Sequence, residues 1–300
     1  MNQRNIGFRI FRVFNIAALS MFGLFTAYPF LNTLAMALND GTDTVRGGIT
    51  IFPRVFTVSN FTMLLSDRGI RSAAVVTVSR VVLGTLLALL VQFGAAYAFA
   101  KKDLKFRSAL TIFLLIPGFI SGGIVPVFIL YKNLGLLNNF WVYVLPGAFS
   151  LYNMVIIRTY MYTIPVELEE SAKIDGANEI RIFFRIIIPL CMPIIATIIL
   201  WTAVGLWNDW TTTLYFITKS SLYTLQFILE QVIKSSEKYA QMIQDAIRAG
   251  NGTVYNLKLK ITPESVRSAQ VILTTLPIIL LYPFLQKYFI KGIMIGAIKD

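Results

Sequence analysis

Six long stretches without any charged residue dominate this sequence of 300 residues. They contain 19 to 27 residues each and run over Val13–Asn39, Val81–Ala100, Ser108–Tyr131, Asn133–Ile157, Ile186–Asn208 and Ser268–Gln286. A membrane-spanning helix needs roughly 20 apolar residues to cross about 30 Å of hydrocarbon. Spanning β-strands would alternate apolar and polar residues, whereas these runs are continuous. The stretches therefore predict an all-α membrane protein with six transmembrane helices.

The composition excludes several classes of protein. Only 14% of the residues are charged and the mean hydropathy is +0.68, whereas soluble chains carry about 25% charged residues. The chain has no histidine and a single cysteine, Cys191, so histidine-based triads, histidine metal sites and a disulfide scaffold are excluded. We expect no catalytic residue and no metal site. We assign the net charge of +12 to anchors beside anionic lipid and not to nucleic-acid binding.

Lysine and arginine near the ends of the stretches predict the orientation. With both termini in the cytoplasm, 14 of these residues lie on the cytoplasmic side, four of them in the tight link 101–107. We therefore expect a cytoplasmic segment 1–13 and a single membrane domain 14–300. Its elements are spans near 14–38, 72–100, 108–131, 139–162, 187–208 and 268–288, a cytoplasmic loop 163–189 and an outer segment 209–267. A signal peptide cleaved after Ala35-Met36-Ala37 is the alternative, although its apolar run exceeds the usual 7–15 residues or so.

The outer segment contains apolar residues at helical spacing. They are Leu222, Leu225, Leu229, Val232 and Ile233. This stripe predicts an amphipathic helix whose charged side carries Glu230, Lys234, Glu237 and Lys238. The helix either docks on the membrane domain or presents a face to an outside partner.

The cytoplasmic loop 163–189 has the features of two short, stiff helices. Pro165 suits a first helical turn, and three glutamates that follow it favour the positive end of the helix dipole. Gly176 can adopt a positive φ and end the first helix, and Asn178 can cap the second. The second helix enters the membrane near Pro189. Such an element suits a lever that is moved by a cytoplasmic partner.

This loop also carries a family motif. Glu170-Ser171-Ala172, then Gly176 and Ile186-x-Ile188-Pro189 match the pattern Glu-Ala-Ala, three residues, Gly, nine residues, Ile-x-Leu-Pro, with departures at Ser171 and Ile188. The chain resembles the permease subunits of bacterial carbohydrate-uptake ABC importers, in which this pattern is the EAA loop. The resemblance extends to Ala95–Ala98, to Trp207-Asn208, to Thr262–Glu264 and to the C-terminal stretch from Tyr282 to Lys299, and it is nearest to permeases for oligosaccharides and complex-polysaccharide fragments.

The resemblance implies a type I importer permease in the bacterial cytoplasmic membrane, paired with a second, dissimilar permease subunit. It also implies two cytoplasmic ATPase subunits that use ATP and Mg²⁺ and an extracytoplasmic sugar-binding protein. The chain itself contains no Gly-x-x-x-x-Gly-Lys-Ser/Thr phosphate loop, so we expect it to bind no cofactor and to be no enzyme. The residues implied to contact an ATPase are Glu169, Glu170, Ser171, Ala172, Asp175, Gly176, Ala177 and Pro189.

Candidate contacts for an oligosaccharide are aromatic and planar polar residues in or near the spans. They are Tyr152, Asn153, Trp201, Asn208, Asp209 and Arg80. For each of these the alternative is a structural role, such as packing for an aromatic ring, internal pairing for Arg80 and an interfacial cap for Asp209. The outer loops carry 12 basic and 8 acidic residues, an excess that favours acidic sugars.

Two other functions compete with this interpretation. A gradient-driven secondary transporter for a polar solute would need ionisable coupling groups inside the membrane. The six predicted spans contain no carboxylate, and Arg80 is the only charged residue that lies away from their ends. A membrane-embedded enzyme would need a nucleophile, metal or carboxylate pair that the spans lack. An ATP-driven importer is therefore favoured over both.

Overall fold

The computed structural model describes residues 6–120, 122–234 and 262–296 of the chain. Within these ranges every regular element is helical, apart from one isolated bridge between Asn39 and Phe56. Helices satisfy all their backbone polar groups within one segment, which a hydrocarbon environment demands. The prediction of an all-α membrane fold is confirmed. The chain divides into two compact units, Met1–Arg68 with Leu229–Leu276, and Gly69–Ile228 with Pro277–Asp300.

The first unit begins with the long helix α1 (Ile6–Ala37), followed by α2 (Gly41–Thr44) and α3 (Ser59–Ser66). Two fully buried asparagines hold the chain after α1 in place. Asn39 accepts a hydrogen bond from the Val55 amide at 2.8 Å, and Asn60 donates to the carbonyls of Ala37 and Asn39 at 2.9 and 3.0 Å. The two side-chain amides thus supply hydrogen-bond partners for backbone groups after the end of α1, where the chain is not helical.

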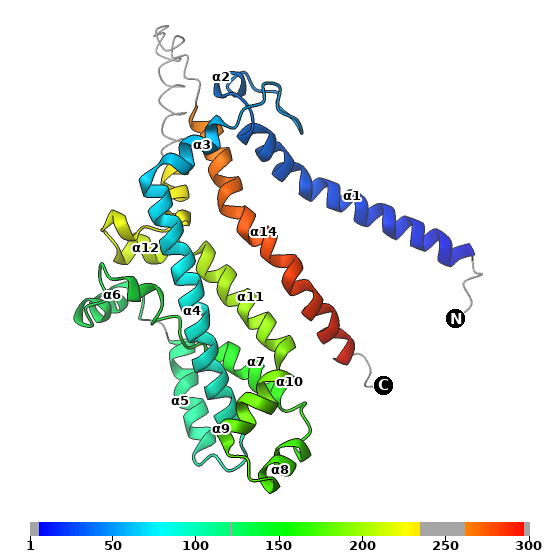
Figure 1. Cartoon of the computed structure of the whole chain (residues 1–300), viewed down its shortest axis with the longest axis vertical. Coiled ribbons are helices and arrows are strands. Elements are labelled where there is room, and N and C mark those ends of the chain that lie inside the picture. The colour runs from blue at the N-terminus through cyan, green and yellow to red at the C-terminus, as the bar shows by residue number, and fades with distance from the viewer. Residues whose placement is uncertain (1–5, 121, 235–261, 297–300) are drawn as a thin grey trace. The chain divides into compact units, whose positions relative to one another are not determined.

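The second unit contains most of the remaining helices (Figure 1). They are α4 (Arg68–Ala100), α5 (Arg107–Phe119), α6 (Ile124–Asn133), η1 (Phe140–Tyr143), α7 (Leu151–Met161), α8 (Glu167–Ile174), α9 (Glu179–Ile182), η2 (Phe183–Ile187), α10 (Ile188–Leu190), α11 (Met192–Asn208), α12 (Thr211–Phe216) and η3 (Ser220–Leu222). A further helix, the outer helix, covers 225–234. Both it and α14 (Pro263–Gly296) belong partly to each unit.

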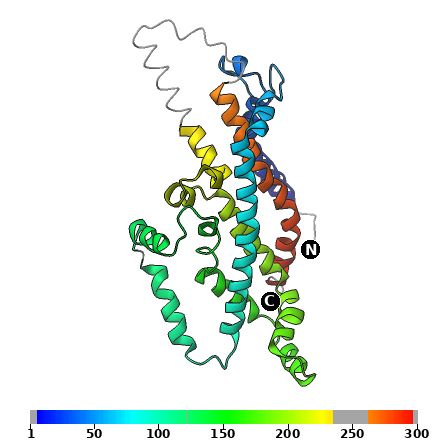
Figure 2. The same ribbon diagram turned by 60° about the vertical axis from the view of Figure 1, so that its left-hand side comes forward.

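Two described helices are long and apolar enough to cross a membrane, Gly7–Ala37 and Arg68–Ala100. Two bent pairs raise the number to four if each pair is one span: α5 with α6, bent by 114°, and Glu179–Leu190 with Met192–Asn208, bent by 80°. The first bend is visible in Figure 2. Within 139–162 the helices are the short η1 and the 11-residue α7, while α14 contains all of 268–288. The count of six spans, the domain boundaries and the orientation of the termini stay predictions.

The main hydrophobic core of the second unit joins α4, α7 and the helices from α9 to α11. Its fully buried members include Ala96 of α4, Met154 and Ile157 of α7, and Ile182 and Ile198. A second core, around Val142, Tyr143 and Phe216, joins α4, η1 and α12. Both cores hold α4 against the chain that follows α6.

The outer helix starts later than its apolar pattern predicts. Leu222 lies in η3, and Tyr223 has an extended backbone. The helix begins at residue 225 because the Thr224 hydroxyl accepts from the Phe227 amide at 3.4 Å, as an N-cap does. Leu225 and Leu229 are buried as expected, and so is Phe227. Glu237 and Lys238 lie outside the described residues.

Close approach of α11 to α4 makes Gly84 sensitive to substitution. A Cβ atom at Gly84 would lie 2.7 Å from Leu206 Cδ1, whereas a Cβ atom at Gly94 meets nothing within 4 Å. We expect Gly84→Val to destabilise the protein by about 1–3 kcal/mol through overpacking and Gly94→Val to have little effect. Thermal inactivation of the purified transporter measures this difference. Equal inactivation temperatures for both variants would show that α4 and α11 are not in contact at Gly84.

Candidate functional site

The loop 163–189 folds into two short helices separated by a sharp turn. α8 ends at Ile174, Gly176 has a φ of +76°, and the Ala177 amide donates to the Ala172 carbonyl at 2.9 Å. This is a glycine C-cap. Asn178 then caps α9 by accepting from the Arg181 amide at 2.8 Å. Both turn predictions are confirmed.

The start of α8 differs slightly from the sequence prediction. The helix begins at Glu167 with Val166 as its N-cap. Pro165 therefore lies outside the first helical turn, and its carbonyl accepts from the Leu168 amide at 3.3 Å. Proline keeps its rigid φ there, but the entry into the helix is a tight turn that precedes it.

Several apolar and acidic side chains of this segment are exposed. Ile174 is 86% exposed and Ile180 is 69% exposed, and Leu168 and Phe184 are also open to the surroundings. Glu167, Glu170 and Asp175 are exposed as well. Large apolar side chains grouped with charges on an exposed surface are typical of a binding surface for another protein.

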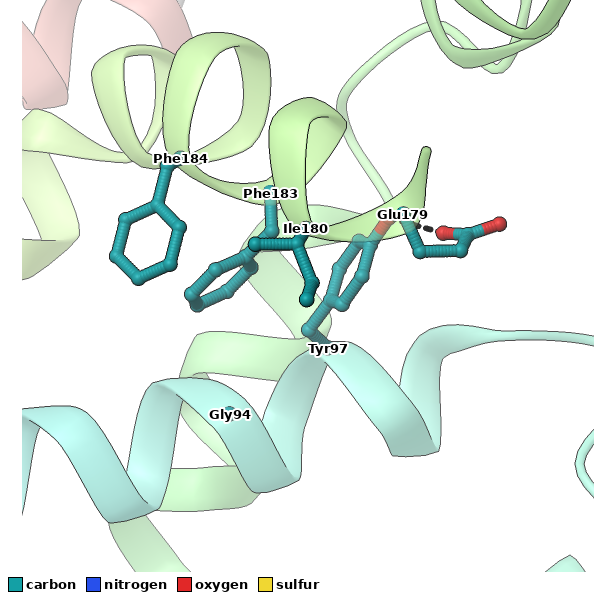
Figure 3. A pocket seen from close by; sticks show the side chains of 6 residues that line it. All are labelled: Gly94, Tyr97, Glu179, Ile180, Phe183 and Phe184. Atoms are coloured by element: carbon teal, nitrogen blue, oxygen red, sulfur yellow. Dashed lines mark hydrogen bonds between the residues drawn. The ribbon is translucent and has the colours of Figure 1, made fainter. Parts of the chain in front are cut away.

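A charged network fixes the segment to the end of α4. Lys101, the residue after α4, forms ion pairs with Glu169 of α8 and with Glu179 of α9, the latter at 3.0 Å between Nζ and Oε2. The Tyr97 hydroxyl donates to Glu179 at 2.6 Å, as Figure 3 shows, and Lys173 contacts the same carboxylate at 2.7 Å. The Lys101 ammonium also lies 4.2 Å from the centre of the Tyr97 ring.

The network favours the charged form of Lys101. Its partial burial alone would lower the pKa of the ammonium group, but the hydrogen bonds to Glu169, Tyr97 and Glu179 outweigh burial and raise that pKa. Lys101 therefore stays protonated and paired. The sequence did not predict this network, because its members are separated by up to 82 residues.

An open pocket of about 240 Å³ lies beside the network. Its lining residues, drawn in Figure 3, are Gly94, Tyr97, Glu179, Ile180, Phe183 and Phe184. Behind it, Ile182, Ile187 and Cys191 are buried in the main core against α4 and α7. The segment is thus packed against α4 and α7 by some of its residues, while others are exposed.

Arg80 is the centre of a second cluster, at the far end of α11. Arg80 lies on α4, and its side chain is fully buried. Its Nε donates to the Leu206 carbonyl at 2.8 Å, and its Nη2 donates to the Asp209 carbonyl at 2.9 Å and to the Asp209 carboxylate at 3.2 Å. The guanidinium lies 4.9 Å from the centre of the Tyr143 ring. Carbonyls at a helix C-terminus lack helical partners, and Arg80 supplies donors to them.

Asp209 has a structural role in the same cluster. While one oxygen pairs with Arg80, Oδ1 accepts from the Thr211 hydroxyl at 2.7 Å and from the Thr212 amide at 3.1 Å. It therefore joins the end of α11 to the start of α12, which agrees with the cap that the sequence suggested. Arg80 is paired internally, as the structural alternative for this residue proposed.

Neighbouring hydroxyls extend this cluster to the outer helix. The Tyr143 hydroxyl bonds to Thr213 at 2.9 Å and donates to the Leu222 carbonyl at 2.7 Å. The Thr77 hydroxyl of α4 accepts from the Leu225 amide at 2.9 Å. These hydrogen bonds are buried or partly buried. They therefore satisfy polar groups whose burial without a partner would be costly.

Two other candidate substrate contacts come together. The rings of Tyr152 on α7 and Trp201 on α11 stack with centres 6.4 Å apart and planes inclined by 25°. Tyr152 is 68% exposed and Trp201 is 46% exposed. Asn153 is half-buried next to Tyr152, and Asn208 is exposed at the end of α11. The aromatic pair was not predicted as a pair.

Removal of Arg80 tests the cluster at the end of α11. We expect Arg80→Met to destabilise the protein by about 3–5 kcal/mol, because it leaves Asp209 and two carbonyls without their buried donor. Asp209→Asn should cost less, since an amide oxygen can still accept from Thr211 and Thr212. Size-exclusion chromatography after graded heating measures both. Equal stability of Arg80→Met and the unsubstituted protein would contradict the assigned role.

The chain matches known transport proteins over almost its whole length. Residues 80–295 match the family described as binding-protein-dependent transport system inner membrane component. Protein LplC of Bacillus subtilis (strain 168) is 36% identical over 97% of this chain and 95% of its own length. The polygalacturonan/rhamnogalacturonan transport system permease protein YtcP of the same organism is 32% identical over 97% of this chain and 99% of its own length.

A solved structure shares the fold. One chain of a bacterial ABC transporter involved in the import of the acidic polysaccharide alginate is 26% identical, with a TM-score of 0.82 over 96% of this chain and 100% of that chain. The resemblance that the EAA pattern indicated is confirmed, as are the permease architecture and the membrane location. The chain belongs to the family of binding-protein-dependent transport system inner membrane components and is a multi-pass inner-membrane permease subunit of an ABC transporter, without catalytic activity of its own.

Proposed function

We propose that this permease forms half of the pathway of an ATP-driven importer for acidic oligosaccharides. Two similar proteins support the substrate class: YtcP is named for polygalacturonan and rhamnogalacturonan, and the solved transporter for alginate. The excess of basic residues in the predicted outer loops fits a negatively charged sugar. The expected partners are a second, dissimilar permease, an extracytoplasmic sugar-binding protein and two cytoplasmic ATPases that use ATP and Mg²⁺.

The network at Lys101 is the observation that carries the mechanism. The exposed side of α8 and α9, with Glu170, Ser171, Asp175 and Gly176, is the surface proposed to contact an ATPase. Through Glu169 and Glu179 the same helices are paired with Lys101. A displacement of α8 therefore moves α4 as well as α11, which continues from α9 by way of Pro189.

The part of α4 around Thr77 and Arg80 carries the displacement further. Arg80 ties α4 to the end of α11, and Thr77 ties it to the outer helix. In our proposal, ATP-driven closure of the ATPases moves α8, and the joined pair α4 and α11 moves the outer segment. Alternating access of the pathway follows from this motion of one rigid pair.

Tyr152 and Trp201 are the proposed sugar contacts of this chain. Stacked, exposed aromatic rings offer a flat apolar surface to the C–H face of a sugar, and the amide of Asn153 lies on the same helix. Arg80 and Asp209 are bonded to each other instead, so we assign neither of them to the sugar.

Reconstitution with the partner subunits tests the proposed function. Proteoliposomes should take up labelled oligogalacturonate when ATP and Mg²⁺ are enclosed with the ATPase subunits, and this uptake should persist when ion gradients are collapsed. The physical reason is that the predicted spans contain no carboxylate that could couple transport to an ion. Uptake driven by a sodium or proton gradient without ATP would establish the secondary transporter instead.

Substitution of Lys101 tests the link between α8 and α4. We expect Lys101→Met to preserve assembly but to reduce substrate-stimulated ATP hydrolysis several-fold, because α8 then moves without α4. Lys102→Met is the matched control, since Lys102 is exposed and no ion pair to it occurs among the described residues. Stimulation of the Lys101→Met transporter equal to that of the control would contradict the proposed link.

Truncation of the aromatic pair tests the sugar contact. Tyr152→Ala and Trp201→Ala should each raise the sugar concentration needed for half-maximal uptake by roughly two- to tenfold, the range expected for the loss of one aromatic contact. Basal ATP hydrolysis should not change. Phe113→Ala, at a 69% exposed position on α5, provides the control. If neither variant changes the sugar concentration needed for half-maximal uptake, the two rings do not contact the sugar.

A further inference from the structure

A pair of arginines at one end of α5 and α7 has no acidic partner among the residues that the structure describes. Arg107 is the first residue of α5, and its Nη2 donates to the Tyr162 hydroxyl. Arg158 lies one helical turn before Tyr162, which is the C-cap of α7. The Cζ atoms of Arg107 and Arg158 lie 5.8 and 6.0 Å from the centre of the Tyr162 ring. Two guanidinium groups thus converge on one phenol ring.

This arrangement differs from that of Lys101, a few residues away in the sequence. Lys101 is matched by two carboxylates, whereas the described part of the chain places no carboxylate within ion-pair distance of Arg107 or Arg158. The Nε atom of Arg158 is shielded from solvent and has no hydrogen-bond partner among the described residues. A partly shielded cation pair with an unbonded donor is unfavourable unless an anion completes it.

The local helix ends affect the two arginines differently. The carbonyl end of α7 offsets part of the charge of Arg158, because cations are favoured at helix C-termini. The amide end of α5 instead adds positive potential beside Arg107. Lys105, which is exposed in the link before α5, adds a further positive charge, and Asp103 in the same link is the nearest acidic residue in the sequence. The net local field remains positive.

The surface of α5 indicates the source of the anion. No residue of α5 is buried, and Leu110, Ile112 and Ile116 are among its exposed apolar side chains. Phe106, just before the helix, is 81% exposed. With 13 residues, α5 is about 20 Å long, slightly more than the depth of one leaflet. An apolar helix of this length, with an aromatic residue and cations at its start, matches one leaflet and its headgroup layer.

We propose that Arg107, Arg158 and Tyr162 bind the phosphate of an anionic phospholipid whose acyl chains lie along α5. The two guanidinium groups supply charge-assisted hydrogen bonds to the phosphate oxygens, and the Tyr162 ring separates the headgroup from the hydrocarbon. The site lies beside the helices of the proposed ATPase surface, because Tyr162 precedes α8 by only five residues. It does not depend on the proposed sugar or on the Lys101 network.

Native mass spectrometry of the assembled transporter tests this site. The transporter is released from nanodiscs made of phosphatidylcholine and phosphatidylglycerol in equal parts, and retained lipids are counted. We expect phosphatidylglycerol to be retained over phosphatidylcholine, and Arg107→Gln/Arg158→Gln to lower its retention roughly tenfold or more. Lys132→Gln/Lys219→Gln removes the same charge from exposed positions elsewhere and should leave retention unchanged. Equal retention by both double variants overturns the proposal.

Further experiments distinguish a bound lipid from other bound anions. Arg107→Lys/Arg158→Lys keeps the charge and should keep most of the retention, which also guards against misfolding of the glutamine variant. Added inorganic phosphate should not displace the lipid, and displacement would mean a site for free phosphate instead. If the glutamine variant loses the ATPase subunits in a pull-down but keeps phosphatidylglycerol, the arginines belong to the ATPase interface and the proposal is wrong. Sugar uptake in phosphatidylcholine alone tests the transport function separately.

Discussion

Two contacts of α4, one with the C-terminal end of α11 and one with the helices that lead into α11, are the constraint on which the second unit depends. At one end a fully buried arginine, Arg80, bonds to the carboxyl end of α11. At the other end Lys101 pairs with the helices that lead into α11. Arg80 and Lys101 are separated by 21 residues, or about 31 Å of helix, which is close to the thickness of the hydrocarbon core. Between them, Ala96 and Ile198 are buried in the core that joins α4, α7 and α11.

A helix pair that is fixed at both ends can transmit displacement without bending. A buried ion pair is costly to form and more costly to break, so it fixes geometry more than it adds stability. The Arg80 cluster fits this description, because it bonds α11, α12 and the ring of Tyr143 at once. In the proposed mechanism a partner applies force to the exposed side of α8 and α9, and the displacement reaches the outer helix.

Local features were predictable from the sequence, but contacts between distant residues were not. The positive φ of Gly176, the cap by Asn178 and the helical nature of the apolar stretches follow from local rules that need no partner. The sequence named both Arg80 and Asp209, yet they are 129 residues apart, and nothing local indicates that they meet. The start of the outer helix was misplaced by an apolar pattern that continues through η3, where Thr224 sets the true boundary. Tyr152 and Trp201 were named for their chemistry, whereas their stacking results from the packing of α7 on α11.

The distance between α4 and α11 in different nucleotide states is the most direct test of this account. Spin labels at exposed positions report on it: Leu90 with Met192 near one end, and Val82 with Asn208 near the other. If the two helices move as one rigid pair, both distance distributions are the same in the nucleotide-free transporter and in the ATP-trapped transporter, while a label at Ile174 moves relative to α5. A change in either α4–α11 distance between these states would show that the helices move independently and would contradict the account.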